Sequence, residues 1–136
     1  MYVLFIVLNQ VEHLTDVLTK MKDMGLRGAT VIESMGSKRM LDKDVHNISF
    51  LNSIVRSLEG NHRTNKTIFS VIERKEQVER AMDEIEKILG GDMKGPNKGI
   101  MFVLPVTHLR GGELERHIES RETKKILKEE YESEYY

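Results

Sequence analysis

The chain has no cysteine, which excludes a disulfide scaffold, a thiol nucleophile and a thiolate zinc site together. It also lacks an excess of either charge, because 21 basic and 22 acidic side chains leave a formal net charge of −1. That balance argues against a nucleic-acid-binding protein built on bulk positive charge. The apolar run Tyr2 to Leu8 has no preceding basic region and is too short to span a bilayer. We therefore expect a cytoplasmic protein that neither inserts into membranes nor binds nucleic acid.

The usual catalytic and metal-binding motifs are missing as well. The histidines show neither an H-E-x-x-H pair nor another tight ligand spacing; they are His13, His46, His62, His108 and His117. No G-x-S-x-G is present, and the serines lack an evident His/Asp arrangement. Most acidic residues, such as Glu79, Asp83 and Glu86, fall on the polar face of a predicted helix, where solvation is the simplest role. We therefore expect neither an enzyme nor a bound metal.

What is present is a strong alternation of strand and helix patterns. Continuous apolar runs rich in β-branched residues predict strands, and apolar positions three or four apart predict helices. In chain order these are a strand at 2–8, a helix at 11–24, strands at 28–34 and 66–72, a helix at 75–89 and a strand at 100–106. The order β-α-β-β-α-β predicts an α+β, ferredoxin-like sandwich over residues 1–110.

Two segments lie outside this pattern. Residues 36–65 form a long connection between the second and third strands, and the apolar positions at 48–58 within it have helical spacing. Residues 111–136 are highly charged and predict a solvated helical extension at the C-terminus. Two helices can cover only one face of four strands, yet the strands are apolar on both faces. This mismatch predicts a partner layer, most simply other copies of the chain.

Two short cationic segments are candidates for binding an anion. The first is the glycine-rich loop GGDMKGPNKG, residues 90–99, with Lys94, Gly95, Lys98 and Gly99 as candidate contacts. The second follows the second strand and contains Lys38 and Arg39. The simpler alternative for residues 90–99 is a helix stop followed by a turn, and the simpler alternative for the second is a solubilising loop.

Three stretches give the chain a likeness to a known family. They are GLRGATV at 25–31, Gly36 with Arg39 at the start of the long connection, and GIMFVLPV at 99–106. Together they resemble the PII family of nitrogen-regulatory signalling proteins, over Tyr2 to about Arg110. The resemblance implies a ferredoxin-like homotrimer that binds an adenine nucleotide such as ATP, ADP or AMP between subunits. It also implies that residues 36–65 act as a T-loop that contacts a target protein.

The resemblance assigns expected roles to particular residues. Thr30 would contact the adenine, and Gly36 and Arg39 would lie at the phosphate side of the T-loop base. Gly99 would belong to the phosphate-side B-loop, near which Lys98 lies, and Arg110 is the counterpart of arginines after the last strand. The T-loop glutamine that helps the family bind magnesium corresponds to Met40, a poor magnesium ligand, so no metal is expected. CutA-type proteins share the trimeric fold, so a structural or interaction module without a small ligand is the alternative.

Overall fold

The computed structural model describes residues 1–41 and 64–135. It divides into two compact units, Met1–Pro105 and Val106–Tyr136, which are treated separately below. The helical spacing expected at 48–58, and most of the expected T-loop, lie outside the described residues.

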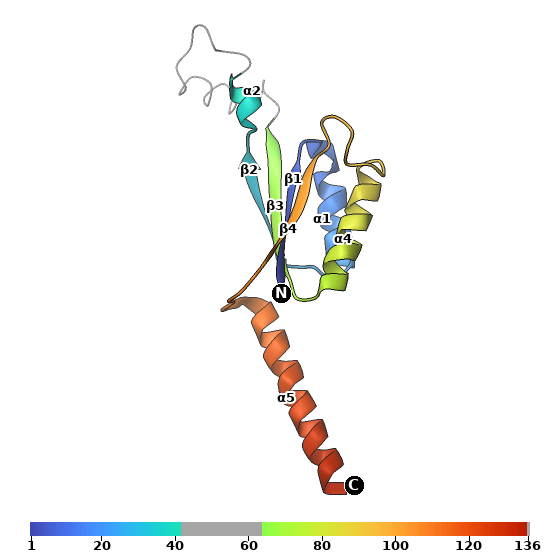
Figure 1. Ribbon diagram of the computed structural model, residues 1–136, viewed down its shortest axis with the longest axis vertical. Helices are drawn as coiled ribbons and strands as arrows, with labels where there is room; N and C mark the ends of the chain where they lie inside the picture. Colours follow the sequence, from blue (N-terminus) through green and yellow to red (C-terminus); the bar gives the residue numbers. More distant parts are fainter. Residues whose placement is uncertain (42–63, 136) are drawn as a thin grey trace. The chain divides into compact units, whose positions relative to one another are not determined.

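The first unit is built on a four-stranded antiparallel sheet (Figure 1). Its strands are β1 (Tyr2–Leu8), β2 (Ala29–Ser34), β3 (Asn65–Ile72) and β4 (Gly99–Pro105), in the spatial order β2-β3-β1-β4. Each neighbouring pair is antiparallel. The central strands are β3 and β1, with β2 at one edge of the sheet and β4 at the other. The fold is therefore α+β, and the arrangement is compatible with a ferredoxin-like domain.

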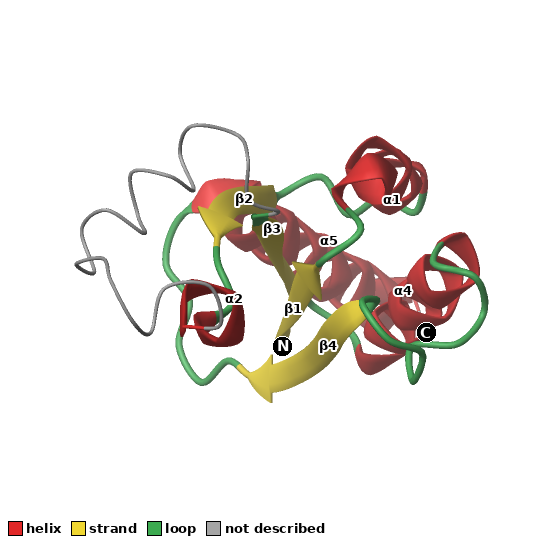
Figure 2. Cartoon of the chain, turned by 90° about the horizontal axis from the view of Figure 1, so that it is seen from above, coloured by secondary structure: helices red, strands yellow, loops and turns green. Residues whose placement is uncertain are grey.

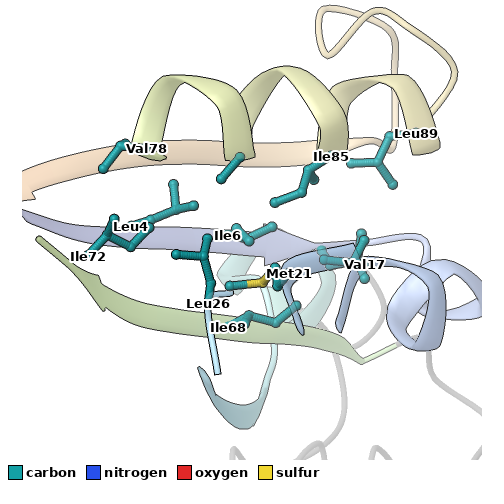
Figure 3. Close-up of a cluster of buried hydrophobic side chains, with 12 residues drawn as sticks. Leu4, Ile6, Val17, Met21, Leu26, Ile68, Ile72, Val78, Ile85 and Leu89 are labelled. Carbon is teal, nitrogen blue, oxygen red and sulfur yellow. The ribbon is translucent and has the colours of Figure 1, made fainter. Parts of the chain in front are cut away.

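Two helices cover one face of this sheet, as Figure 2 shows. They are α1 (Leu14–Asp23), which follows the short 3₁₀ turn η1 (Val11–His13), and α4 (Lys75–Ile88). Side chains alternate between the two faces of a strand, and Leu4, Ile6 and Leu8 of β1 point toward the helices and are fully buried. They pack against the apolar stripes of both helices to form the core shown in Figure 3, which includes Leu4, Ile6, Val17, Met21, Ile68, Ile72, Val78, Ile85 and Leu89.

Both covering helices end in the same way. At the end of α4, the Gly90 N–H donates to the Lys87 carbonyl at 3.2 Å and the Gly91 N–H to the Glu86 carbonyl at 2.8 Å. Gly25 has the equivalent place after α1, and its φ of 84° and that of Gly90, 102°, are values that glycine adopts without a Cβ penalty. This is the Schellman arrangement, which satisfies the last helical carbonyls.

Two further helices are present. The five-residue helix α2 (Ser37–Leu41) follows β2 after two intervening residues, at a place where the sequence predicts only loop. The second unit contains α5 (Gly112–Tyr135), which corresponds to the predicted C-terminal helix. Among the described residues, no helix is both long and apolar enough to cross a membrane.

Candidate functional site

The two predicted cationic segments emerge from the same end of the sheet but from opposite edges. In the ladder, Ser34 of β2 pairs with Asn65, and Gly99 of β4 pairs with Leu8. Two strands, β3 and β1, lie between these edges. Three strand spacings separate β2 from β4, which is about 14 Å. The sheet therefore anchors the α2 segment and the glycine-rich loop well apart within one chain.

One of the two loop lysines expected to contact an anion, Lys98, forms a hydrogen bond within the loop region itself. Lys98 Nζ donates to the carbonyl oxygen of Leu89 at 2.5 Å, and this bond is partly buried. A Cβ on Gly90 would lie 2.8 Å from the same Nζ, so the ammonium group sits directly against the end of α4. Lysine near a helix C-terminus satisfies free carbonyls and interacts well with the helix dipole. The alternative prediction, a helix stop followed by a turn, describes this part of the loop.

Gly99 has a specific steric reason to be glycine. Its φ is 113°, and a Cβ built on it would lie 1.9 Å from the Val7 carbonyl oxygen. The backbone of β4 thus begins in direct contact with β1, at a distance that no side chain permits. The contact is with the sheet, so the glycine is explained without any ligand.

Lys94 is exposed, but its surroundings are acidic. Its backbone N–H donates to Asp92 Oδ1 at 2.8 Å. Next to it lies a hollow of about 420 Å³ between α4, the loop and β4, which we call the α4–β4 groove. Its lining includes three carboxylates of α4 and three methionines, namely Glu79, Asp83, Glu86, Met82, Met93 and Met101, with Lys94 as the basic member of the lining. This side of the loop attracts cations more than anions.

Thr30 lies on the sheet face that α1 and α4 leave uncovered. It pairs with Phe69, and the same row of paired residues continues across the sheet through Phe5 to Phe102. The Phe5 ring stacks on Phe102 with centroids 5.1 Å apart and tilts against Phe69 at 5.7 Å. The neighbouring rows of this face, hereafter the open face, are also mainly aliphatic; they contain Val3, Val7, Ile32, Val71, Ile100 and Leu104.

A polar cluster at the base of the long connection was missed from the sequence. Ser34 Oγ donates to Asn65 Oδ1 at 2.6 Å, and Asn65 Nδ2 donates to Asn9 Oδ1 at 3.2 Å. The Ser34 hydroxyl also lies 2.7 Å from that of Thr67. Asn65 is only 8% exposed, so the cluster joins the ends of β2, β3 and β1 through a buried amide. Its sequence signal is the presence of small polar residues at three strand ends.

One carboxylate beside this cluster has a shifted pKa. The Thr64 hydroxyl donates to Glu33 Oε1 at 3.0 Å, and Lys66 Nζ lies 3.2 Å from the same oxygen. The Thr64 hydrogen bond first, and then the Lys66 ammonium, hold the pKa of Glu33 below its usual value. Both contacts connect β2 to β3 where the long connection leaves the sheet.

The other predicted residues are placed as follows. Gly36 precedes α2, and Lys38 and Arg39 are residues of α2, with Lys38 exposed. Gly95 lies in the loop, where a Cβ would be 3.4 Å from Lys98 Cε. Arg110 is exposed and belongs to the second unit, Val106–Tyr136. Over 1–41 and 64–135, no group of three or more His, Asp or Glu side chains could hold a metal ion.

Taken together, the first unit offers an extended apolar face, two loop segments at one end of the sheet and an acidic groove. When the chain is compared with known proteins, no family model matches it, and no curated protein is similar enough to count as a relative.

Proposed function

We propose that the chain is a PII-like regulatory protein with a ferredoxin-like domain that works as a homotrimer. The open face carries the proposal, because it presents three phenylalanines and six aliphatic side chains on one side of a sheet. Exposed apolar patches of this kind mark association surfaces. Burying this face against other copies removes it from water and leaves α1 and α4 on the outside.

Assembly also supplies a way to join the two loop segments. When the β2 edge of one copy lies next to the β4 edge of another, the α2 segment of the first approaches the glycine-rich loop of the second. The proposed ligand of such a cleft is an adenine nucleotide or a related anion. Thr30, Lys38 and Arg39 come from one side, and Lys94, Gly95 and the backbone around Gly99 from the other. The segment 36–65 then contacts a target protein, with its affinity set by the ligand.

Calorimetry and thermal unfolding with ATP, ADP, AMP and cyclic nucleotides test the ligand. A ligand present at 100 times its Kd stabilises the native state by about 2.7 kcal/mol, which raises Tm by several degrees. We expect Arg39→Ala to weaken binding at least about tenfold, as for loss of a charge-assisted phosphate contact. Arg27→Ala, which removes an exposed arginine of the same unit, is the control. Absence of binding by every nucleotide contradicts this part of the proposal.

A second candidate function is a trimeric interaction module without a small ligand. It is favoured by one observation: Lys98, one of the predicted anion contacts, donates to the Leu89 carbonyl. This candidate predicts the same assembly, no thermal shift with any nucleotide, and capture of a protein partner in nucleotide-free buffer. The two candidate functions therefore predict different results in the nucleotide titration and the same mass for the assembly.

A further inference from the structure

The α4–β4 groove combines an apolar floor with an acidic rim. Met82, Met93 and Met101 are half-buried and pack against the core, so their thioethers form the floor. Methionine side chains are flexible and polarisable, and they suit surfaces that adapt to a bound segment. The rim is made by Glu79, Asp83 and Glu86.

The loop that borders this groove is held in place by hydrogen bonds. The Met93 N–H donates to Glu86 Oε1 at 3.3 Å, which brings the loop down onto α4. The Lys98 bond to the Leu89 carbonyl holds the other arm of the loop. The groove is therefore formed before any partner arrives, and binding requires little ordering of the backbone.

The three carboxylates follow one stripe of α4. They occupy positions i, i+4 and i+7, so they are about 6 Å and 4.5 Å apart along the axis. Basic side chains at the same spacing on a partner helix would meet them in register. Lys94 in the lining opposes this charge, as does Lys75, whose Nζ lies 3.7 Å from Glu79 on an exposed part of the helix. The surface therefore complements a cationic segment.

From this complementarity we propose that the α4–β4 groove binds a basic amphipathic helix of a partner protein. Apolar side chains of that helix lie on the methionine floor, and its lysines or arginines pair with Glu79, Asp83 and Glu86. This is the helix-in-groove mode of recognition. Lys94 and Gly99 line this groove and are also assigned to the proposed nucleotide cleft. Peptide binding is tested without nucleotide, so its failure is distinguishable from the failure of the proposed function.

Methionine-methyl NMR on the full chain tests the location of binding. The probe is an amphipathic helical peptide of leucine and lysine, and the control peptide has glutamate in place of every lysine. We expect the lysine peptide to shift the methyl signals of Met82, Met93 and Met101. Met21, which is buried between helix and sheet, is the internal control and is expected to stay unchanged. Shifts of Met21 and Met24 as large as those in the groove would overturn the assignment.

Charge variants test the rim. The double variant Glu79→Gln/Asp83→Asn is expected to weaken binding of the lysine peptide roughly fivefold at about 0.15 M salt. Asp23→Asn removes an exposed carboxylate of α1 as the matched control and is expected to change the Kd less than twofold. Lys94→Gln is expected to strengthen binding, because it removes a like charge from the lining.

Three further outcomes contradict the proposal. One is equal binding of the lysine and glutamate peptides. Another is equal weakening by Asp23→Asn, which would mean nonspecific attraction. The third is full displacement of the peptide by spermidine at equal concentration, which would identify a site for small cations instead of a helix.

Discussion

Gly99 is a residue whose identity the packing of the sheet alone requires. Its φ of 113° and the 1.9 Å approach of a built Cβ to the Val7 carbonyl leave no room for a side chain. The resemblance to the PII family implies that Gly99 belongs to a ligand-binding loop, but its contact with β1 is sufficient to require glycine at this position. A loss of function on substitution is therefore informative only when stability has been measured.

We expect Gly99→Ala to destabilise the fold by at least about 2 kcal/mol, the combined cost of backbone strain and the displaced β1–β4 contact. Gly28→Ala is the control, because no atom lies within 4 Å of a Cβ there and its φ is not in the left-handed region. Urea unfolding of both variants measures the difference. Equal stability of the two variants would show that the start of β4 shifts without cost.

Glu33 gives a prediction that depends on pH. Its pKa is lowered in the folded chain, by the Thr64 hydrogen bond and by Lys66, from a usual value of 4.5. A lowered folded pKa means that the contact stabilises the fold above the unfolded pKa and that this stabilisation is lost as pH falls through the folded value. We expect NMR titration of the Glu33 carboxyl carbon to give a value below 4.5, and Thr64→Val to raise it. An unchanged pKa of Glu33 in Thr64→Val would show that the Thr64 hydrogen bond does not cause the lowered pKa.

At the scale of elements, the end of α4 depends on a side chain from the next loop. Lys98 donates to the Leu89 carbonyl beside the two glycines that end the helix. We expect Lys98→Met to lower stability by about 1 kcal/mol, since it removes a hydrogen bond and a favourable charge at the helix C-terminus. Lys94→Met, an exposed lysine of the same loop, is expected to change stability by less than about 0.5 kcal/mol. Equal effects in urea unfolding would contradict the capping role.

The elements of the first unit could be read from the sequence because each has a strong periodic pattern. Strands 2–8 and 66–72 and helix 75–89 bury one face or stripe completely, so their apolar positions repeat regularly. Helix α2 was missed because five residues, two of them basic, show no period. Its neighbours at 42–63 lie outside the described residues.

The candidate site could be read less well, because it depends on contacts between elements. Nothing in the local sequence indicates that Lys98 folds back onto the Leu89 carbonyl, a contact set by the path of the loop. The stripe Glu79, Asp83 and Glu86 was interpreted as a solvated face, and only its place beside half-buried methionines makes it a groove. Likewise, the Ser34–Asn65–Asn9 cluster requires the register of three strands, which side-chain type alone does not give.

For the whole molecule, the open face is the feature that favours association with another chain. β1 contributes to both faces of the sheet: Leu4, Ile6 and Leu8 are fully buried on the helix side, and its other residues are only partly covered. The outer strand β4 shows the imbalance most clearly, because Ile100, Phe102 and Leu104 are all exposed. A row of apolar side chains on an edge strand invites association with other chains unless it is covered.

We therefore expect light scattering on the full chain to give three times the protomer mass of 15.8 kDa. Leu104→Glu places a charge on the open face at a side chain that is 48% exposed in one copy, so the protomer can tolerate it while the assembly cannot. Leu127→Glu, at a similarly exposed leucine of α5, is the matched control and is expected to keep the trimer mass. Circular dichroism of both variants separates dissociation from unfolding. If the wild-type chain is a dimer that Leu104→Glu dissociates, the open face is an interface but the threefold assembly is wrong. If the wild-type chain is a folded monomer at micromolar concentration, both the interface and the threefold assembly are wrong.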